Sequence, residues 1–251
     1  MVGQSQRDGM ASGEYQLVWS DEFNQPGLPD PQKWSYERGY IRNGERQYYT
    51  RGRAENARVE GGFLIIEARH DSAQVDGQVR PVTSASLTTQ GKHSWTYGRY
   101  EVRAQLPASR GTWAAAWLLG ANISRVGWPT CGEIDIMEHV GYHPDTVHCW
   151  AHTKVYQEAP PRDAHVYLPD ATTTFHVYAL EWHPDRLDFF MDHTLVLTFK
   201  NDGAGINHWA FDHPFFLILN VAFGGTWGGR QGVDLASLPQ RLIVDYVRVY
   251  Q

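Results

Sequence analysis

The sequence predicts an all-β fold, a sandwich or jelly roll of many antiparallel strands. Short runs rich in Val, Ile, Tyr, Phe, Thr and Trp recur along the chain, and Gly, Pro, Asn and Asp separate them. No segment keeps a helical apolar period over three turns. The 251 residues show no break in composition and no fixed-period repeat. We therefore expect one domain over residues 13–251, preceded by a polar tail at residues 1–12.

The expected strands follow one another along the whole domain. They cover residues 15–20, 57–68, 97–105, 112–119, 133–138, 146–151, 175–182, 187–191, 194–199, 215–221 and 241–250. In the run 97–105 charged and mostly apolar residues alternate, which predicts one buried face. Strict alternation in the last run places Asp245 on the face of Val247 and Val249. A carboxylate on such an apolar face needs hydrogen bonds or a metal ion.

Composition excludes several classes of protein. Lys and Arg total 22 against 28 Asp and Glu, a net charge of −6, so we expect no nucleic-acid partner. No apolar run approaches the 18 residues of a membrane-spanning helix, so we expect no membrane partner. The chain has 10 Trp, 13 Tyr and 10 Phe. Because a buried indole N–H needs a partner, we expect some tryptophans to line a wet surface.

Cysteine content and the first residues leave the compartment open. Cys131 and Cys149 are too few for a disulfide framework and match no zinc module. If residues 133–151 form a hairpin, the two cysteines lie on neighbouring strands, and either free thiols or a bridge would suit them. The polar residues 1–12 lack the apolar region of a signal peptide. A secreted protein whose signal peptide has been removed would look the same, so this does not decide the compartment.

Three carboxylates in residues 132–138 (GEIDIME) carry the strongest chemical signal. In a regular strand Glu133 and Asp135 face one way and Glu138 the other. A one-residue bulge at Ile136–Met137 would return Glu138 to the face of the other two. The two glutamate Cα atoms would then be about 13 Å apart. Their carboxyl groups could converge to roughly 5 Å, the separation found in retaining glycosidases.

Electrostatics supports an acid–base role for this triple. Asp135 between the glutamates repels further negative charge and helps to keep one glutamic acid protonated near neutral pH. The competing interpretation is a metal cluster, because carboxylates are hard ligands and His139, His143, His148 and His152 follow closely. The irregular spacing of the histidines disfavours a catalytic metal.

Residues 132–141 (GEIDIMEHVG) resemble the active-site strand of glycoside hydrolase family 16, in its bulged, laminarinase-like branch. The resemblance covers nearly the whole chain, including WSDEFN at 19–24, NGERQYYT at 43–50, ENARVEGGFLIIEAR at 55–69, YGRYEVRAQLP at 97–107, TWAAAWLLG at 112–120, FHVYALEW at 175–182, FFLILNVAFGG at 215–225 and DYVRVY at 245–250. It implies a β-jelly-roll sandwich of two antiparallel sheets with a concave substrate cleft. It also implies hydrolysis, with retention, of internal β-1,3-glucosidic bonds in β-glucans such as laminarin or mixed-linkage β-1,3-1,4-glucan.

The resemblance assigns roles to individual residues. Glu133 matches the nucleophile, Asp135 its assisting carboxylate and Glu138 the acid/base. Strand alternation independently puts Trp113 and Trp117 on one face, and His148, Trp150 and His152 on another, although core positions would also explain these aromatic residues. The resemblance favours a sugar-binding role and ranks His148 above His152. The residues it implies for substrate binding are Asn56, Trp113, Trp117, Trp128, His148, Asn220 and Trp227.

Two further details follow from the resemblance. Where the family often reads Thr-Ser-(Gly/Ala)-Arg, this chain has Ser86 in place of the arginine, which puts the subsite on the non-reducing side in doubt. Glu22, Gly62 and Asp245 line up with a calcium site on the convex side of many relatives. Two carboxylates and a carbonyl suit a structural Ca²⁺. A hydrogen-bonded Asp245 without metal is the alternative, and no catalytic metal or organic cofactor is expected.

The sequence therefore predicts a monomeric β-glucan hydrolase, extracellular or periplasmic as the family implies. Other enzymes of the same family stay open: a licheninase, a galactan hydrolase such as an agarase, and a transglycosylase. A non-catalytic β-glucan-binding domain is the alternative outside the enzymes. The presence of both glutamates weighs against it.

Overall fold

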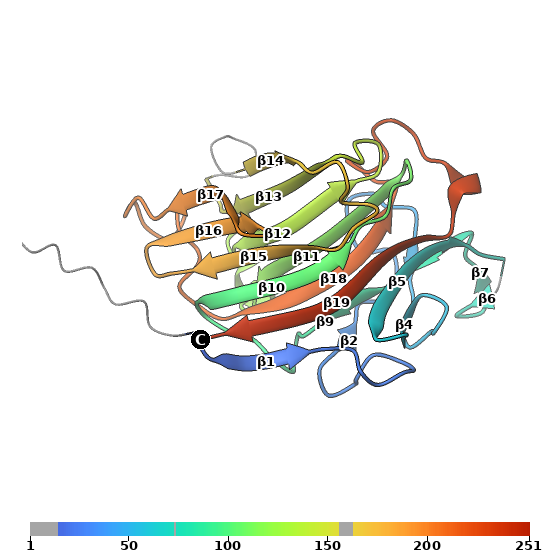
Figure 1. The fold of residues 1–251 in the computed structure, drawn as a ribbon, viewed down its shortest axis with the longest axis horizontal. Helices are drawn as coiled ribbons and strands as arrows, with labels where there is room; N and C mark the ends of the chain where they lie inside the picture. The colour runs from blue at the N-terminus through green and yellow to red at the C-terminus, as the bar shows by residue number, and fades with distance from the viewer. Residues whose placement is uncertain (1–14, 73, 156–162) are drawn as a thin grey trace, which may run out of the picture.

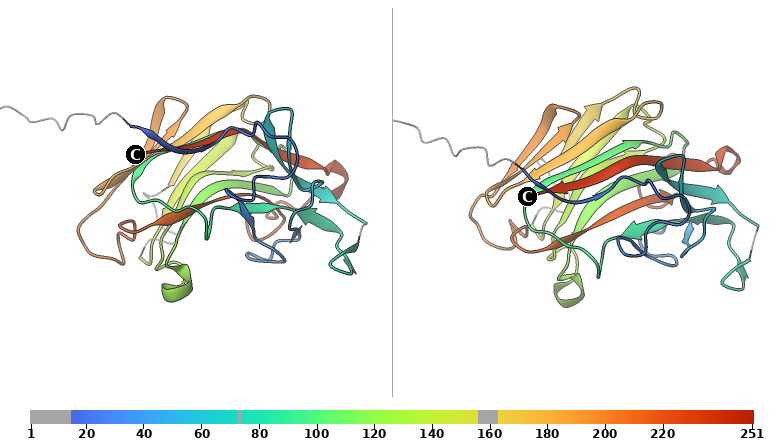
Figure 2. Two further views of the ribbon diagram at one scale, coloured as in Figure 1. Left: turned by 90° about the horizontal axis from the view of Figure 1, so that it is seen from below. Right: turned by 60° about the horizontal axis from the view of Figure 1, so that its bottom comes forward.

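The computed structural model describes residues 15–72, 74–155 and 163–251, so the predicted tail at residues 1–12 lies outside the described residues. Two large and mostly antiparallel β-sheets stack face to face in it (Figures 1 and 2). Apolar side chains from both sheets fill the space between them. This arrangement is the β-sandwich that the strand pattern predicts.

The first sheet has ten strands and one parallel pair, β3 with β8. Its order is β17 (Thr194–Lys200), β16 (Arg186–Met191), β15 (His176–Trp182), β10 (Gly98–Gln105), β19 (Gln240–Tyr250), β5 (Phe63–His70), β8 (Val82–Ser84) and β3 (Tyr48–Tyr49), with β1 (Leu17–Asp21) beside β19 and β4 (Ala57–Glu60) beside β5.

The second sheet has seven strands. Its order is β14 (Asp163–Tyr167), β13 (Thr146–His152), β12 (Glu133–Val140), β11 (Thr112–Gly120), β18 (Phe215–Phe223), β9 (Ser86–Thr88) and β2 (Ser35–Tyr36). The remaining described elements are the ribbon of β6 (Gln74–Val75) and β7 (Gln78–Val79), the helix α1 (Ile123–Val126) and the 3₁₀ turn η1 (Leu235–Ser237). Every residue of β18 is buried, because one face packs in the core and the other is covered as well.

Most of the predicted strands are confirmed, and the differences have local causes. Residues 57–68 form two strands rather than one, because Gly61 and Gly62 adopt φ values of 63° and 84° and turn the chain into a hairpin. Several strands of two or three residues were missed, since so short a run carries no readable alternation. The alternation of β10 is confirmed, with every second residue buried.

The predicted faces of the last strand are wrong beyond Val244. Tyr246 pairs with Arg103 and Val244 with Ala104, so Asp245 has no partner across this ladder and sits in a β-bulge. The bulge resets the alternation, and Val247 joins Val244 on the buried face. Asp245 is instead partly exposed and forms an ion pair with Arg103.

The state of the two cysteines and the length of the helices can be read directly from the structure. Cys131 and Cys149 are both buried free thiols, and they belong to different apolar clusters. Within the described ranges, none of the helices has the length and apolarity needed to cross a membrane.

Gly120 ends β11 where the chain before β12 passes too closely for a side chain. A Cβ atom there would lie 2.0 Å from the carbonyl oxygen of Cys131. We predict that Gly120→Ala lowers the free energy of unfolding by about 1–3 kcal/mol, as overpacking does. Gly203→Ala is the control, because Gly203 has φ +72° but open space around it. Urea unfolding of both variants checks this, and an equal or smaller loss in Gly120→Ala would contradict it.

Candidate active site

A β-bulge in β12 gathers the three carboxylates. Asp135 lies opposite Trp117 of β11 and Met137 opposite Ala116, so Ile136 has no partner. On the other side the ladder to β13 is interrupted between Asp135 and Glu138. Ile136 and Met137 are both fully buried in the core. The predicted bulge is therefore confirmed, and all three carboxylates line one cleft.

The cleft lies on the face of the seven-stranded sheet that turns away from the core, and its volume is about 470 Å³. Alternate residues of β11 divide between the two sides, as predicted: Trp113 and Trp117 face the cleft, whereas Ala114 and Ala116 pack in the core. The lining residues are Glu37, Ile41, Arg42, Asn43, Glu45, Gln90, Trp113, Ala115, Trp117, Leu119, Ile123, Trp128, Glu133, Asp135, Glu138, Phe216 and Asn220.

Two indole groups hold the two glutamates. The Nε1 of Trp113 donates to Oε1 of Glu138 at 2.8 Å. The Nε1 of Trp128 donates to Oε2 of Glu133 at 2.9 Å, from the loop between α1 and β12. Because the two donors come from different segments, each carboxyl group is oriented separately. These contacts explain part of the high tryptophan content, since each indole finds a partner beside the cleft.

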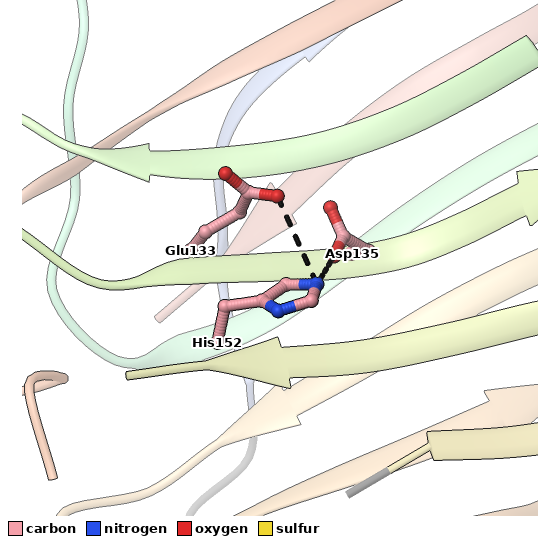
Figure 3. A group of neighbouring side chains, drawn as sticks. All are labelled: Glu133, Asp135 and His152. Carbon is pink, nitrogen blue, oxygen red and sulfur yellow. Dashed lines mark ion pairs between the residues drawn. The ribbon is translucent and has the colours of Figure 1, made fainter. Parts of the chain in front are cut away.

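His152 of β13 contacts the carboxylates directly. Figure 3 shows one ring nitrogen turned toward both Glu133 and Asp135. This Nε2 lies 3.1 Å from Oδ2 of Asp135 and 4.0 Å from Oε1 of Glu133. Burial opposes the charged imidazolium, but the hydrogen bond and charge of Asp135, with the charges of Glu133 and Glu138, raise the pKa of His152 to about 10. His152 is therefore a cation at neutral pH and offsets the charge of Asp135.

His148 lies on the same face of β13 but plays a different part. Its ring packs edge-on against Trp227, with centroids 4.9 Å apart. Burial lowers the pKa of His148 to about 4, so the ring is neutral. The structure therefore brings His152 against Asp135 and Glu133, whereas the higher-ranked His148 lies opposite Glu138 in the ladder of β12 and β13. Alternation alone could not separate the two, because it assigns a face and not a neighbour.

Burial and mutual repulsion shift the pKa values of both glutamates upward. Burial, followed by the charge of Asp135, raises the pKa of Glu133 to about 8. The same two causes raise the pKa of Glu138 well above its ordinary value. The site therefore retains a proton near neutral pH, as an acid catalyst requires.

Of two other predicted residues, Asn220 lines the cleft and Trp227 packs behind one of its tryptophans. Asn220 of β18 accepts a hydrogen bond from Nε1 of Trp117 at 2.8 Å, and its amide donates to the hydroxyl of Tyr49 at 3.0 Å. Trp227 stands on the loop after β18 and packs edge-on against Trp113, with ring centroids 5.4 Å apart. Trp227 is not among the described residues that line the cleft, so the predicted rim role of the loop of residues 224–227 stays a prediction that its contact with Trp113 supports.

Asn56 does not border the cleft. Its side chain is fully buried, and its amide donates to the carbonyl of Glu67 at 3.1 Å and to the hydroxyl of Thr83 at 3.0 Å. The side-chain oxygen accepts a hydrogen bond from Thr50 at 2.9 Å. All its polar atoms are engaged, so in this structure Asn56 supports the fold and does not reach a sugar.

Sequence reasoning missed the wall that loops contribute. Glu37, Arg42 and Glu45, with their neighbours Ile41 and Asn43, come from the loop between β2 and β3. A loop has no period that tells which side chains face inward. The motif NGERQYYT at 43–50 includes Asn43 and Glu45 but did not tell that their side chains line a cleft.

Possible metal ligands are present but already paired. Two clusters within the described residues have suitable geometry: Glu133, Asp135 and His152, and Glu181, His183 and Asp188. A protonated His152 has no lone pair for a metal. In the second cluster Arg99 pairs with Glu181 and Arg186 with Asp188.

The predicted calcium ligands are brought near one another by strand pairing. Asp21, beside Glu22, pairs with Val247, and Leu64, two residues after Gly62, pairs with Val244. Glu22 and Gly62 therefore flank two strands, β1 and β5, that both pair with β19, the strand that carries Asp245 in its middle. Arg248 holds the carboxylate of Glu22 with two hydrogen bonds, at 2.9 and 2.8 Å, and Arg103 pairs with Asp245. Both carboxylates are therefore held by arginines in this structure.

A sandwich with a tryptophan-lined cleft and two oriented glutamates defines a class of protein, a glycoside hydrolase that acts on a polysaccharide. Comparison with known families narrows the class. The chain matches Glycosyl hydrolases family 16 over residues 45–248. The protein belongs to this family, as the motif in β12 indicated.

Similar proteins agree with this assignment. The chain is 51% identical to a beta-glucanase from Rhodothermus marinus, an alignment that covers 100% of this chain and 90% of that protein. A laminarinase structure from the same organism superposes with a TM-score of 0.90 at 52% identity, covering 95% of this chain and 98% of the other. A mutant of a non-specific endo-β-1,3(4)-glucanase of family GH16 was co-crystallised with 1,3-β-D-cellotriosyl-glucose and presents a 1,3-β-D-cellobiosyl-glucose at its active site. It gives a TM-score of 0.89 at 44% identity, covering 97% of this chain and 96% of the other.

The raised pKa of Glu133 predicts a cost in stability. A carboxyl group whose pKa is about 8 when folded and about 4.5 when unfolded binds more protons in the folded state, so stability falls as pH rises between these values. We predict that Glu133→Gln raises the free energy of unfolding above pH 8 by on the order of 1–3 kcal/mol, with no gain below pH 4.5.

Denaturant unfolding across this pH range measures the effect. Glu60→Gln is the control, because Glu60 is exposed and Arg58 lowers its pKa by a hydrogen bond. Its removal should give no gain at any pH. A Glu133→Gln curve parallel to that of the unmodified protein would contradict the prediction.

Proposed function

We propose that the protein is a retaining endo-β-1,3-glucanase that cleaves internal bonds of laminarin-like β-glucans. The observation that carries the proposal is the pair of glutamates on one bulged strand, each held by a tryptophan in a cleft. The names of the similar proteins, a beta-glucanase and a laminarinase, support the same substrate. Mixed-linkage β-1,3-1,4-glucan is the second substrate that we expect, as with the non-specific relative.

The two glutamates divide the chemistry between them. Glu138, with its pKa well above the ordinary value, protonates the glycosidic oxygen as the leaving group departs. Glu133 attacks the anomeric carbon and forms a covalent glycosyl-enzyme. Glu138 then removes a proton from the water that hydrolyses this intermediate. The Trp128 hydrogen bond and the charge of His152 oppose the raised pKa of Glu133 and favour the carboxylate that must attack.

Charge in the cleft favours a neutral polysaccharide. Among the described residues that line it, five carry carboxyl groups and one carries a cation: Glu37, Glu45, Glu133, Asp135 and Glu138 against Arg42. With a single cation among its described residues, itself paired with Glu37, the wall offers little positive charge to attract a sulfated chain. This charge balance therefore weighs against a sulfated galactan such as carrageenan, whereas agarose and lichenan remain for a product profile to decide. The half-exposed ring of Trp128 suits the apolar face of a glucosyl ring.

We propose that the enzyme acts as a monomer outside the cytoplasm. One chain supplies both glutamates and the described cleft wall, so the reaction needs no second copy. A polymeric glucan cannot cross a membrane intact, so its hydrolysis has to take place where the polymer is.

Azide separates the roles of the glutamates. We predict that Glu133→Ala and Glu138→Ala each lower kcat by at least about 10³-fold on laminarin, since each removes a group that acts in the transition state. With an aryl β-glucoside oligomer and azide, Glu133→Ala should give an α-glycosyl azide by direct attack. Glu138→Ala should give a β-glycosyl azide, because azide displaces the α-linked enzyme. NMR of the products decides, and exchanged anomers would reverse the assignment.

Calcium binding is a separate proposal. We propose that Glu22, Gly62 and Asp245 hold one structural Ca²⁺ once Arg248 and Arg103 release the carboxylates. At 100 times the dissociation constant, such an ion adds about 2.7 kcal/mol to the stability of the folded state. We predict that Ca²⁺ raises Tm by several degrees over EDTA, and that Asp245→Asn loses this gain while Glu60→Gln keeps it. An unchanged Tm in the unmodified protein would refute the site.

A further inference from the structure

Arg42 is the one cationic side chain among the described residues that line the cleft. Its guanidinium carbon lies 5.0 Å from the centre of the Trp117 ring. The side chain is 24% exposed and borders the cavity, so a ligand there can reach its N–H groups. A guanidinium placed against an aromatic ring keeps its donors in a fixed plane.

Glu37 fixes the position of Arg42. The two side chains form an ion pair, and the second oxygen of Glu37 accepts a hydrogen bond from the hydroxyl of Ser86 at 2.6 Å. The backbone N–H of Glu37 also donates to the carbonyl of Ser86 at 3.0 Å. Because β2 pairs with β9 in this region, the sheet itself sets the place of Glu37. The ion pair is thus held in place by the hydrogen bonds between Glu37 and Ser86 of the sheet.

Ser86, which holds Glu37, stands at a notable position of β9. The residue is fully buried and pairs with Asn220 across β9 and β18, so it lies within the sheet that carries the cleft. It stands where the sequence resemblance leads one to expect an arginine. In this chain the serine orients Glu37, and the positive charge reaches the cleft from Arg42 on the loop between β2 and β3.

We propose that Arg42 is a substrate-binding residue that donates hydrogen bonds to hydroxyl groups of the glucosyl unit bound in the cleft beside Trp117. The inference rests on the proposed function, because it requires a neutral glucan in the cleft. Trp117 lies opposite Asp135 across β11 and β12, so this unit adjoins the reacting carboxylates. Arg42 is the one cation among the described residues of this wall and supplies charged N–H donors, from which sugar hydroxyl oxygens can accept hydrogen bonds.

The charge of Arg42 has a second effect at the nucleophile. Burial and Asp135 raise the pKa of Glu133, and the positive charge of Arg42 acts in the opposite direction. Removal of the charge should therefore raise the pKa of Glu133 further. The acidic limb of the pH profile of kcat/KM would then move to higher pH.

Steady-state kinetics on laminarin tests the proposal. We predict that Arg42→Gln lowers kcat/KM about 10- to 100-fold, chiefly through KM, and moves the acidic limb upward. Arg42→Lys keeps the charge but loses the planar donors, so it should restore the pH profile while KM stays raised. Glu37→Gln, which frees Arg42, should give an intermediate KM.

Arg38→Gln is the matched control. Arg38 is also paired with an acid, Asp76, but its side chain is 54% exposed and does not line the cleft. It should keep both KM and the pH profile of the unmodified enzyme. Thermal unfolding of each variant shows whether the fold is intact. If Arg42→Gln matches Arg38→Gln in KM and pH profile, or differs from it only in Tm, the proposal is wrong.

The unmodified enzyme separates this proposal from the proposed function. Failure of the unmodified protein to release reducing sugar from laminarin would refute the function itself. The comparison of variants is then made on whichever neutral glycan the enzyme cleaves. Unmodified activity on laminarin with no effect of Arg42→Gln would refute the role of Arg42 alone.

Discussion

Three carboxyl groups share one face of β12 because one residue of that strand, Ile136, is left out of the pairing with β11. Without this bulge Glu138 would point into the core, where an unpaired carboxylate is costly. With it, Ile136 and Met137 are both buried and the acids all face the cleft. The placement of the tryptophans, His152 and the loop wall has a function only around this group.

Gathering these acids has an electrostatic cost, and the surroundings offset it in two ways. His152 brings a positive charge against Asp135, and the indoles of Trp113 and Trp128 donate to the glutamates. The compensation is incomplete, since the pKa values of both glutamates stay raised. An acid catalyst needs a raised pKa to hold its proton, and the same raised pKa lowers the stability of the folded state at higher pH. Stability and function therefore oppose each other at this site.

Strand alternation was a reliable guide wherever a ladder is regular. It gave the faces of β10 and β11 correctly, because the side-chain period of a strand is two. It failed at Asp245, where a bulge resets the period. No pair of adjacent apolar residues marks this bulge in the sequence. The bulge in β12 could be foreseen only because Ile136 and Met137 stand together where one would otherwise face water. Asn56 shows the limit of similarity in sequence, since its position beside a strand does not reveal that it is buried.

The sequence by itself determined the sandwich of strands, the catalytic bulge and the three acids on it, because local alternation and residue type encode them. Which histidine meets Asp135 depends on the pairing register of β12 and β13, and neither strand's sequence predicts that register. Tertiary structure alone decided this, and it also decided that Arg42 and Glu37 enter the cleft, because their loop has no period and is placed by contact with Ser86. Contacts between residues far apart in the chain form only when the strands and loops that carry them pack together, so no local sequence pattern predicts them.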